Sequence, residues 1–290
     1  MHILGEDGDA ELRGRVNAAL RDTAFVRRLD EIRLGKIEWK DGNYPFAAAL
    51  PKYAVEFREN GYDPDAADWT SLLRRLSESP VRAYLLAALD DWALTETDAG
   101  ARKRLFALTA EVTGQPWRTR LAEVWADGER LAKAYDAIPP GERSAGLIAG
   151  VGVRLQVLGQ DGIRRLEDGL LRFPSDFWLH TSIGLHGGKE RQMRLIGAYR
   201  AALAVRPGAA AVHVNLGALL RDGGDLVGAE ACFREAIRLN KNAQGFINLG
   251  AMLYGRGDRA GAKACYREAI RLEPRNAGAF QHLAWIAHRV

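Results

Sequence analysis

The chain has 290 residues, of which 47% are hydrophobic and 27% are charged, a composition typical of a folded globular protein rather than a disordered or fibrous one. Two cysteines and no charged leader before an apolar stretch argue against secretion, and no apolar run reaches the ~20 residues of a membrane span. We therefore expect a cytoplasmic protein that does not act in a membrane and folds without disulfides or metals.

Residues 1–140 show apolar periodicity without internal repetition. Three sets of apolar residues recur at helical spacing: Leu29, Ile32, Leu34 and Ile37; Leu72, Leu73 and Leu76; Leu85, Leu89 and Trp92. Proline and glycine segments separate about six helices, and no alternating strand pattern is present. The sequence thus predicts an irregular helical domain over residues 1–140.

Neighbouring carboxylates in this part, such as Asp90 and Asp91, could in principle serve acid–base chemistry. Such chemistry requires an apolar pocket that shifts their pKa values. Because both residues lie in a charged helical segment, we expect them on a solvated helix face.

The segments 212–242 and 245–276 repeat one another. Four anchors recur at matching positions of the two segments: Gly217 and Gly250, Ala229 and Ala262, Phe233 and Tyr266, Ala236 and Ala269. Small residues let the two helices of a hairpin approach closely, and we expect the aromatic residues to fill the space between repeats. The same frame continues upstream in weaker form.

This pattern resembles the tetratricopeptide repeat, a pair of antiparallel helices that stacks into a solenoid. The resemblance implies an all-α fold: an α-helical hairpin solenoid over residues 141–290, with about three repeats and a C-terminal capping helix. Lys241 departs from the family pattern by replacing its proline. In the last helix we expect Phe280, Leu283 and Ile286 to pack inward.

The whole chain also resembles the helical, repeat-bearing region that follows the kinase domain in a group of bacterial serine/threonine protein kinases. The resemblance rests on segments such as "SPVRAYLLAALDDWA", "GQPWRTRLAEVW" and "RFPSDFWLH". It implies a sensor or docking region. The glycine-rich loop, lysine and aspartates of a kinase are missing, so we predict no catalytic residue and no cofactor. Two pairs of histidines, His180 with His186 and His282 with His288, are each six residues apart. This spacing does not favour a metal site on a helix.

First helices line the concave face of such a solenoid. The "NLG" register places these residues in a peptide-binding groove: Val214, Asn215, Ala218, Arg221, Ile247, Asn248, Ala251, Tyr254, Gln281, His282, Trp285 and Arg289. Asn215, Asn248 and His282 take equivalent positions and would form a polar ladder.

An amide side chain both donates and accepts hydrogen bonds, which suits an extended peptide backbone. In some tetratricopeptide proteins an asparagine at this place binds peptide backbone, so the resemblance implies that role for Asn215 and Asn248. Bonding of both residues to the neighbouring repeat or to water fits the sequence equally well.

Charge differs between the halves. Residues 141–290 hold 21 Lys and Arg against 13 Asp and Glu, a net +8, which leaves 20 against 24, a net −4, before them. The favoured function is a non-catalytic module that binds a protein or peptide. One alternative is a regulatory or docking part of a bacterial kinase system, with catalysis supplied by another polypeptide. The other is an RNA-binding helical repeat, whose binding would fall steeply with salt. Since the basic residues are scattered at helical spacing, nucleic acid is not the expected partner.

Overall fold

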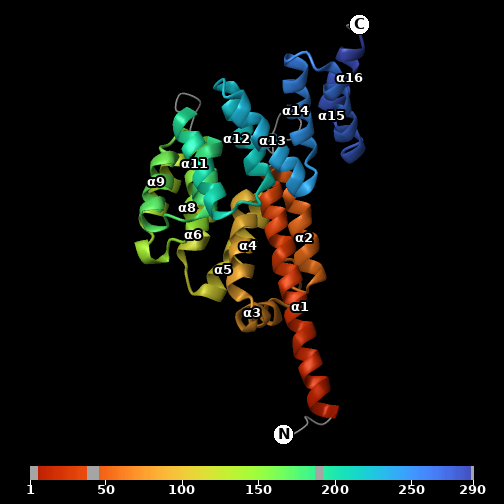
Figure 1. Cartoon of the computed structure of the whole chain (residues 1–290). Coiled ribbons are helices and arrows are strands. Elements are labelled where there is room, and N and C mark those ends of the chain that lie inside the picture. The colour runs from red at the N-terminus through yellow and green to blue at the C-terminus, as the bar shows by residue number, and fades with distance from the viewer. Residues whose placement is uncertain (1–5, 38–45, 187–191, 289–290) are drawn as a thin grey trace. The chain divides into compact units, whose positions relative to one another are not determined.

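The computed structural model describes residues 6–37, 46–186 and 192–288. Over these ranges the chain forms sixteen α-helices and two short 3-10 helices, with no β-strand among them (Figure 1). The predicted all-α fold is therefore confirmed.

The helices pack as two units, Met1–Arg33 with Ala47–Trp125, and Leu34–Phe46 with Ala126–Val290. Packing of helices against one another does not by itself establish an independently folding domain. The boundary predicted at residue 140 from the sequence consequently stays a prediction.

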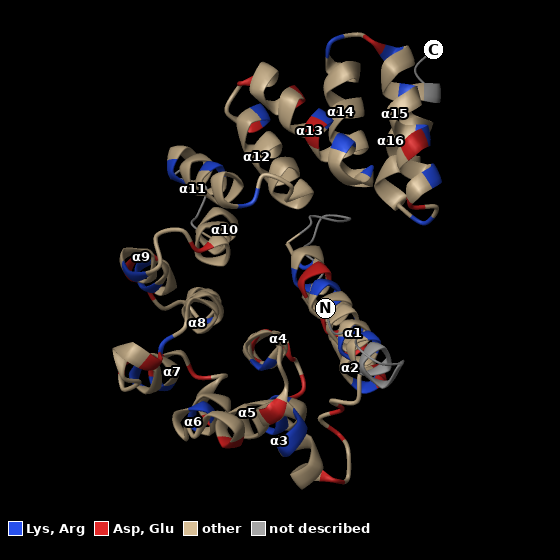
Figure 2. Ribbon diagram, turned by 60° about the horizontal axis from the view of Figure 1, so that its bottom comes forward, with Lys and Arg blue, Asp and Glu red and all other residues tan. Residues whose placement is uncertain are grey.

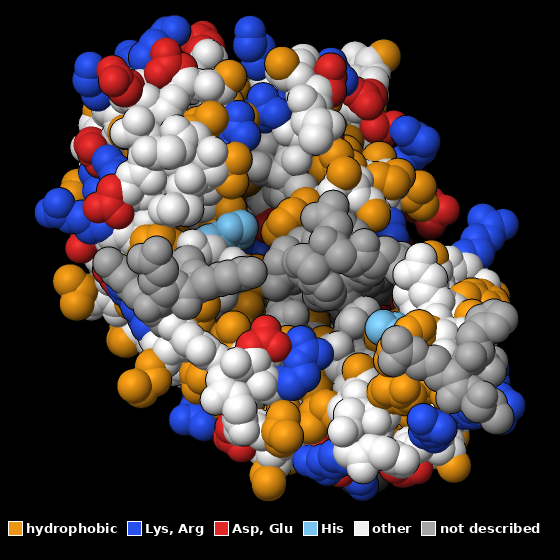
Figure 3. Space-filling model, turned by 90° about the horizontal axis from the view of Figure 1, so that it is seen from above, with side chains coloured by type: hydrophobic (Ala, Val, Ile, Leu, Met, Phe, Trp, Pro, Cys, Tyr) orange, Lys and Arg blue, Asp and Glu red, His pale blue; other side chains and the backbone are white. Residues whose placement is uncertain are grey.

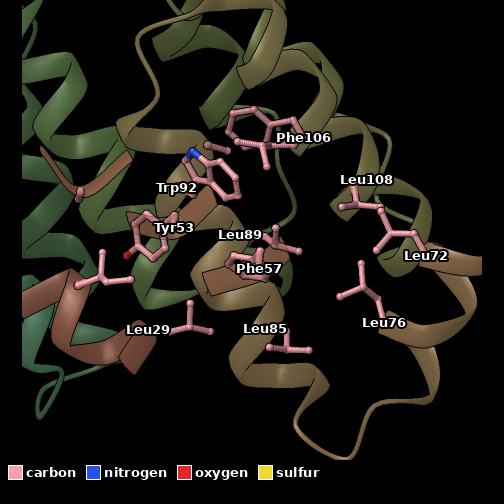
Figure 4. Close-up of a cluster of buried hydrophobic side chains, with 14 of the residues drawn as sticks. Leu29, Tyr53, Phe57, Leu72, Leu76, Leu85, Leu89, Trp92, Phe106 and Leu108 are labelled. Carbon is pink, nitrogen blue, oxygen red and sulfur yellow. The ribbon is translucent and has the colours of Figure 1, made fainter. Parts of the chain in front are cut away.

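The first unit has an apolar core built from most of its helices. Its elements are α1 (Glu6–Gly35, up to Arg33), η1 (Phe46–Ala49, from Ala47), α2 (Leu50–Glu59), α3 (Trp69–Glu78), α4 (Arg82–Thr95), α5 (Ala99–Thr113) and α6 (Trp117–Val124). Figure 4 shows Tyr53 and Phe57 of α2 among leucines of α4 and Phe106 of α5. These side chains are fully buried. The helical spacing of Leu85 and Leu89 in the sequence places both leucines on one face of α4.

Asp90 and Asp91 lie inside this unit, so their predicted place on a solvated helix face was wrong. Asp91 accepts hydrogen bonds from Tyr53 Oη at 2.6 Å and from Arg33 Nε at 3.0 Å. Asp90 is paired with Arg118 of α6. Burial is affordable here because each carboxylate has a cationic partner and hydrogen bonds, and sequence periodicity carries no information about such partners.

The second unit is a row of helical hairpins. Its elements are α7 (Gly128–Asp136), η2 (Pro140–Glu142), α8 (Ala145–Val157), α9 (Gly162–Arg172), α10 (Phe177–His186), α11 (Gln192–Val205), α12 (Ala210–Asp222), α13 (Leu226–Asn240), α14 (Ala243–Gly255), α15 (Arg259–Leu272) and α16 (Ala277–His288). From α8 onward each helix packs against the next in chain order. In Figure 2, α8, α10 and α12 lie on the inner side of the row, and α9 and α11 on the outer side.

The turns inside the last two hairpins share one design. Gly224 and Gly257 have φ values of 85° and 86°, in the left-handed region that glycine adopts without strain. The aspartate that follows each glycine caps the second helix: Asp225 Oδ1 accepts from the Gly228 N–H at 2.8 Å, and Asp258 does the same one repeat later. The repeated "GD" pair thus completes the turn between the two helices of the hairpin and begins the second helix.

Close approach within each hairpin depends on the anchors found in the sequence. A Cβ atom added at Gly217 would lie 2.6 Å from the ring of Phe233, and one at Gly250 would lie 3.0 Å from the ring of Tyr266. Gly184 faces Tyr199 in the same way. The predicted close approach of the two helices at these glycines is confirmed, and each aromatic ring packs against the glycine of its own hairpin.

The last helix, α16, packs through Ala279, Leu283 and Ile286. Phe280 is 49% exposed, so the expectation that it packs inward was wrong. Positions i, i+4 and i+7 share one helix face, and Phe280 lies about 100° away from that face.

Candidate functional site

The described groove residues lie on α12 and α14, which begin the last two hairpins, and on the final helix α16. Three of them are buried: Asn215, and two apolar residues that pack inside the hairpins. Val214 packs in a cluster with Ala236 of α13, and Ile247 in one with Tyr266 of α15. The side chains of Val214 and Ile247 therefore support the hairpins, and the other described groove residues apart from Asn215 are at least partly exposed.

Asn215 is only 5% exposed because another part of the chain covers it. Its Nδ2 donates a hydrogen bond to the backbone oxygen of Ile37 at 3.0 Å. Ile37 lies just beyond the end of α1, where backbone carbonyls have no partner within the helix. The asparagine thus binds peptide backbone, and that backbone belongs to the same chain.

The equivalent residue of the next hairpin, Asn248, is partly exposed. Its Oδ1 lies 3.4 Å from Arg221 Nη1 and 3.5 Å from Gln244 Nε2, both long for hydrogen bonds. Among the described residues its Nδ2 has no acceptor. Asn248 consequently presents an amide donor to whatever occupies this surface.

Two aromatic side chains, one from α14 and one from α16, meet further along the array. The rings of Tyr254 and Trp285 have centroids 4.7 Å apart and are tilted by 56°. Trp285 is 44% exposed and Tyr254 is partly buried. Large aromatic side chains dominate the energetics of protein interfaces, so this pair is suited to anchor an apolar side chain.

The other predicted residues take different places. Ala218 and Ala251 are partly buried and small, and Gln281 is exposed. His282 is exposed but stacks on the ring of Tyr266 at 5.2 Å, which removes it from a continuous polar ladder. Arg289 lies outside the described residues.

Two residues of this surface, Ile37 and Gln244, were not predicted. Ile37 belongs to the helical periodicity of the N-terminal part, and Gln244 lies in no motif. Neither a spacing nor a residue type in the sequence marks their proximity to the asparagines.

A separate cleft of about 440 Å³ lies between α7, η2 and α9. Four arginines line it, three of which make bonds to the protein itself. Arg143 donates to the backbone oxygens of Asp136 and Ile138, Arg172 donates to backbone oxygens near η2, and Arg165 pairs with Asp136 at 2.9 Å. These bonds join α7, η2 and α9 at the start of the array.

Several arginines of the array are paired with nearby carboxylates. Glu230 accepts from Arg234 and from Arg256, and hydrogen bonding to Arg256 holds the pKa of that carboxyl below its usual value. Arg238 and Arg271 pair with glutamates of their own helices. On the face shown in Figure 3, blue side chains stand singly among red and apolar ones rather than in one patch.

Two further observations concern the described parts of the chain only. They contain no cluster of three or more His, Cys, Asp or Glu that could hold a metal ion. None of their helices is both long enough and apolar enough to cross a bilayer.

Comparison with known proteins supports the repeat architecture. Residues 210–242 and 243–276 each match a family model of the tetratricopeptide repeat. A search of curated proteins gave no match. The fold is similar to a chain in the crystal structure of the APC/C hetero-tetramer Cut9-Hcn1, with a TM-score of 0.51 and 15% identity over 83% of this chain and 52% of that one. This chain thus spans about half the length of that relative.

A second structure, that of MamA, gives a TM-score of 0.40 with 18% identity, over 65% of this chain and 96% of the other.

The repeats matched by the family models coincide with α12–α13 and α14–α15, the hairpins that carry Asn215 and Asn248. The chain therefore contains tetratricopeptide repeats within an all-helical, solenoid-like fold.

Proposed function

We propose that this protein is a non-catalytic scaffold that binds a protein or peptide partner on the concave face of its repeat array. The observation that carries the proposal is the available amide of Asn248 on α14, the helix that also carries Tyr254 of the Tyr254–Trp285 pair. An amide donor and an aromatic anchor together match the backbone and one apolar side chain of a bound segment.

A protein partner is favoured over nucleic acid by the pairing of the arginines. Nucleic-acid binding depends on cations that neutralise phosphates. Here four arginines of the array already pair with the carboxylates of Glu230, Glu235 and Glu268. The free cysteines Cys232 and Cys265 are consistent with a reducing compartment such as the cytoplasm, where we place the protein.

Changing Asn248→Ala together with Trp285→Ala is expected to weaken binding of the partner by about 30-fold or more and to lower its recovery accordingly, because a hydrogen bond and an aromatic contact are worth roughly 1 to 2 kcal/mol each in an interface, about 2 to 4 kcal/mol together. The measurement is affinity capture from a lysate of the source organism, quantified by mass spectrometry for the wild type and the variant.

The matched control is Val227→Ala with Arg238→Ala, an apolar and a polar residue that are exposed on the second helix α13. Its captures should equal those of the wild type. If every captured protein is recovered equally by all three forms, the concave face is not the binding surface.

A further inference from the structure

Residues Leu34–Ile37 occupy the array at the position where a ligand is expected. Ile37 is 4% exposed, and Leu34 and Ile37 pack in one apolar cluster with Val212 and Leu216 of α12 and Phe177 of α10. Lys36 between them is buried as well. The segment is therefore a packed part of this surface.

The chemistry of this contact is that of peptide recognition. The helix α1 ends at Gly35, and the Ile37 N–H still bonds back to the Leu34 carbonyl at 3.2 Å. The next carbonyl, that of Ile37, is left over and accepts from the Asn215 amide. An external peptide segment would present the same features. These are a backbone carbonyl that accepts a hydrogen bond from the asparagine and two apolar residues three positions apart.

The two matched repeats differ in whether the chain itself supplies this contact. Asn215 and Asn248 hold equivalent positions in hairpins that match the same repeat family. At Asn215 the chain itself provides the acceptor, whereas the Nδ2 of Asn248 has none among the described residues.

We propose that residues 34–37 are an internal ligand of the array, and that a partner reaches Asn215 only by displacing them. The partner fitted to this surface is a protein segment at the end of a helix, with two apolar residues three positions apart and a free carbonyl after the second. The proposal rests on the proposed function, since it concerns access to the same face. Regulation follows: whatever holds or releases the end of α1 sets how much of the face is open.

The test uses a fluorescent peptide of residues 30–40 added to the full-length protein, with binding read by anisotropy. In the wild type the tethered copy competes at a high effective concentration, so the peptide binds weakly. The Leu34→Ala/Ile37→Ala variant should bind it at least tenfold more tightly, and Asn215→Ala in that background should reverse most of the gain. Equal affinity of the wild type and the double variant would overturn the proposal.

Two controls keep the comparison specific. Leu12→Ala/Val16→Ala changes exposed apolar residues on the same helix and should leave the peptide affinity at the wild-type level. The milder Ile37→Val change should raise the affinity by a smaller factor in the same direction, which preserves the test if the double variant unfolds.

The two proposals fail in different ways. If the double variant binds the peptide but capture from lysate ignores Asn248 and Trp285, the internal ligand stands and the proposed function falls. If capture depends on those two residues while the peptide binds both forms equally, only the internal ligand is wrong.

Discussion

Replacing Arg118 by methionine is expected to lower the free energy of unfolding by about 3 to 5 kcal/mol, the usual cost of removing one partner of a buried ion pair. Arg118 and Asp90 are both buried, and Arg118 also contacts Thr109. Without the guanidinium, the Asp90 carboxylate has no cation to offset its burial. Urea unfolding followed by tryptophan fluorescence measures the loss.

The pH dependence of this variant provides a second readout. Burial raises the pKa of Asp90, and Arg118 acts in the opposite direction. In the variant the folded-state pKa therefore rises further above the unfolded value. A group of this kind stabilises the fold below its unfolded pKa and loses that contribution as pH rises through the folded pKa. The deficit of Arg118→Met should consequently shrink as pH is lowered from 7 toward 4.

The matched control is Arg104→Met, which breaks a pair with Asp65 whose side chains are 52% and 60% exposed. Such surface pairs contribute at most about 1 kcal/mol. A loss at Arg118 no larger than the loss at Arg104 would show that the buried pair does not stabilise the first unit.

Changing Gly162 to alanine is expected to cost about 3 kcal/mol, at the upper end of the usual cost of overpacking. The new Cβ would lie 2.6 Å from the backbone nitrogen of Gln156 and inside van der Waals contact with the carbonyl oxygen of Gly152. Because both atoms are backbone, no side chain can rotate away, and α8 and α9 must separate. Thermal unfolding monitored by circular dichroism measures the change.

The control for this substitution is Gly197→Ala in the middle of α11, where an added Cβ meets no atom within 4 Å. Alanine there should stabilise the helix by about 0.5 to 1 kcal/mol, since glycine loses more backbone entropy on folding. Opposite signs at the two glycines are expected, and equal signs would contradict the packing described for α8 and α9.

The sequence predicted the array well because its repeats are local. Gly217, Phe233 and their counterparts one repeat later lie close along the chain, so matching anchors imply matching hairpins. Apolar spacing together with proline and glycine breaks predicted about six helices before residue 140, and the described residues there form seven α-helices, α1 to α7. Their partners did not: burial of Asp90 and Asp91 depends on Arg118 and Arg33, which lie far from them in sequence.

The groove shows the same limit. Leu29 and Ile32 belong to the core of the first unit, while Leu34 and Ile37 belong to the core of the array. The helical spacing of apolar residues runs without a break from Leu29 to Ile37. It therefore does not indicate that this segment contributes to two separate cores. Register could place Asn215 on the concave face, yet it could not reveal that Ile37 already lies there.

Other sequence-based hypotheses are not tested by the geometry. Docking to a bacterial serine/threonine kinase system, which the resemblance of the whole chain implies, stays a prediction. The RNA-binding alternative also stays a prediction, with salt dependence as its test.

The hydrogen bond between Asn215 and Ile37 joins residues 178 positions apart. During synthesis at ~5–20 residues per second, the ribosome needs on the order of 10 to 40 s to add the asparagine after the isoleucine has been made. Throughout that interval Leu34 and Ile37 have no α12 to cover them. A nascent chain therefore carries an uncovered apolar helix end during this interval. Chaperones can bind that end. It can also enter the Asn215 site of a neighbouring, finished copy of the protein in place of that copy's own segment.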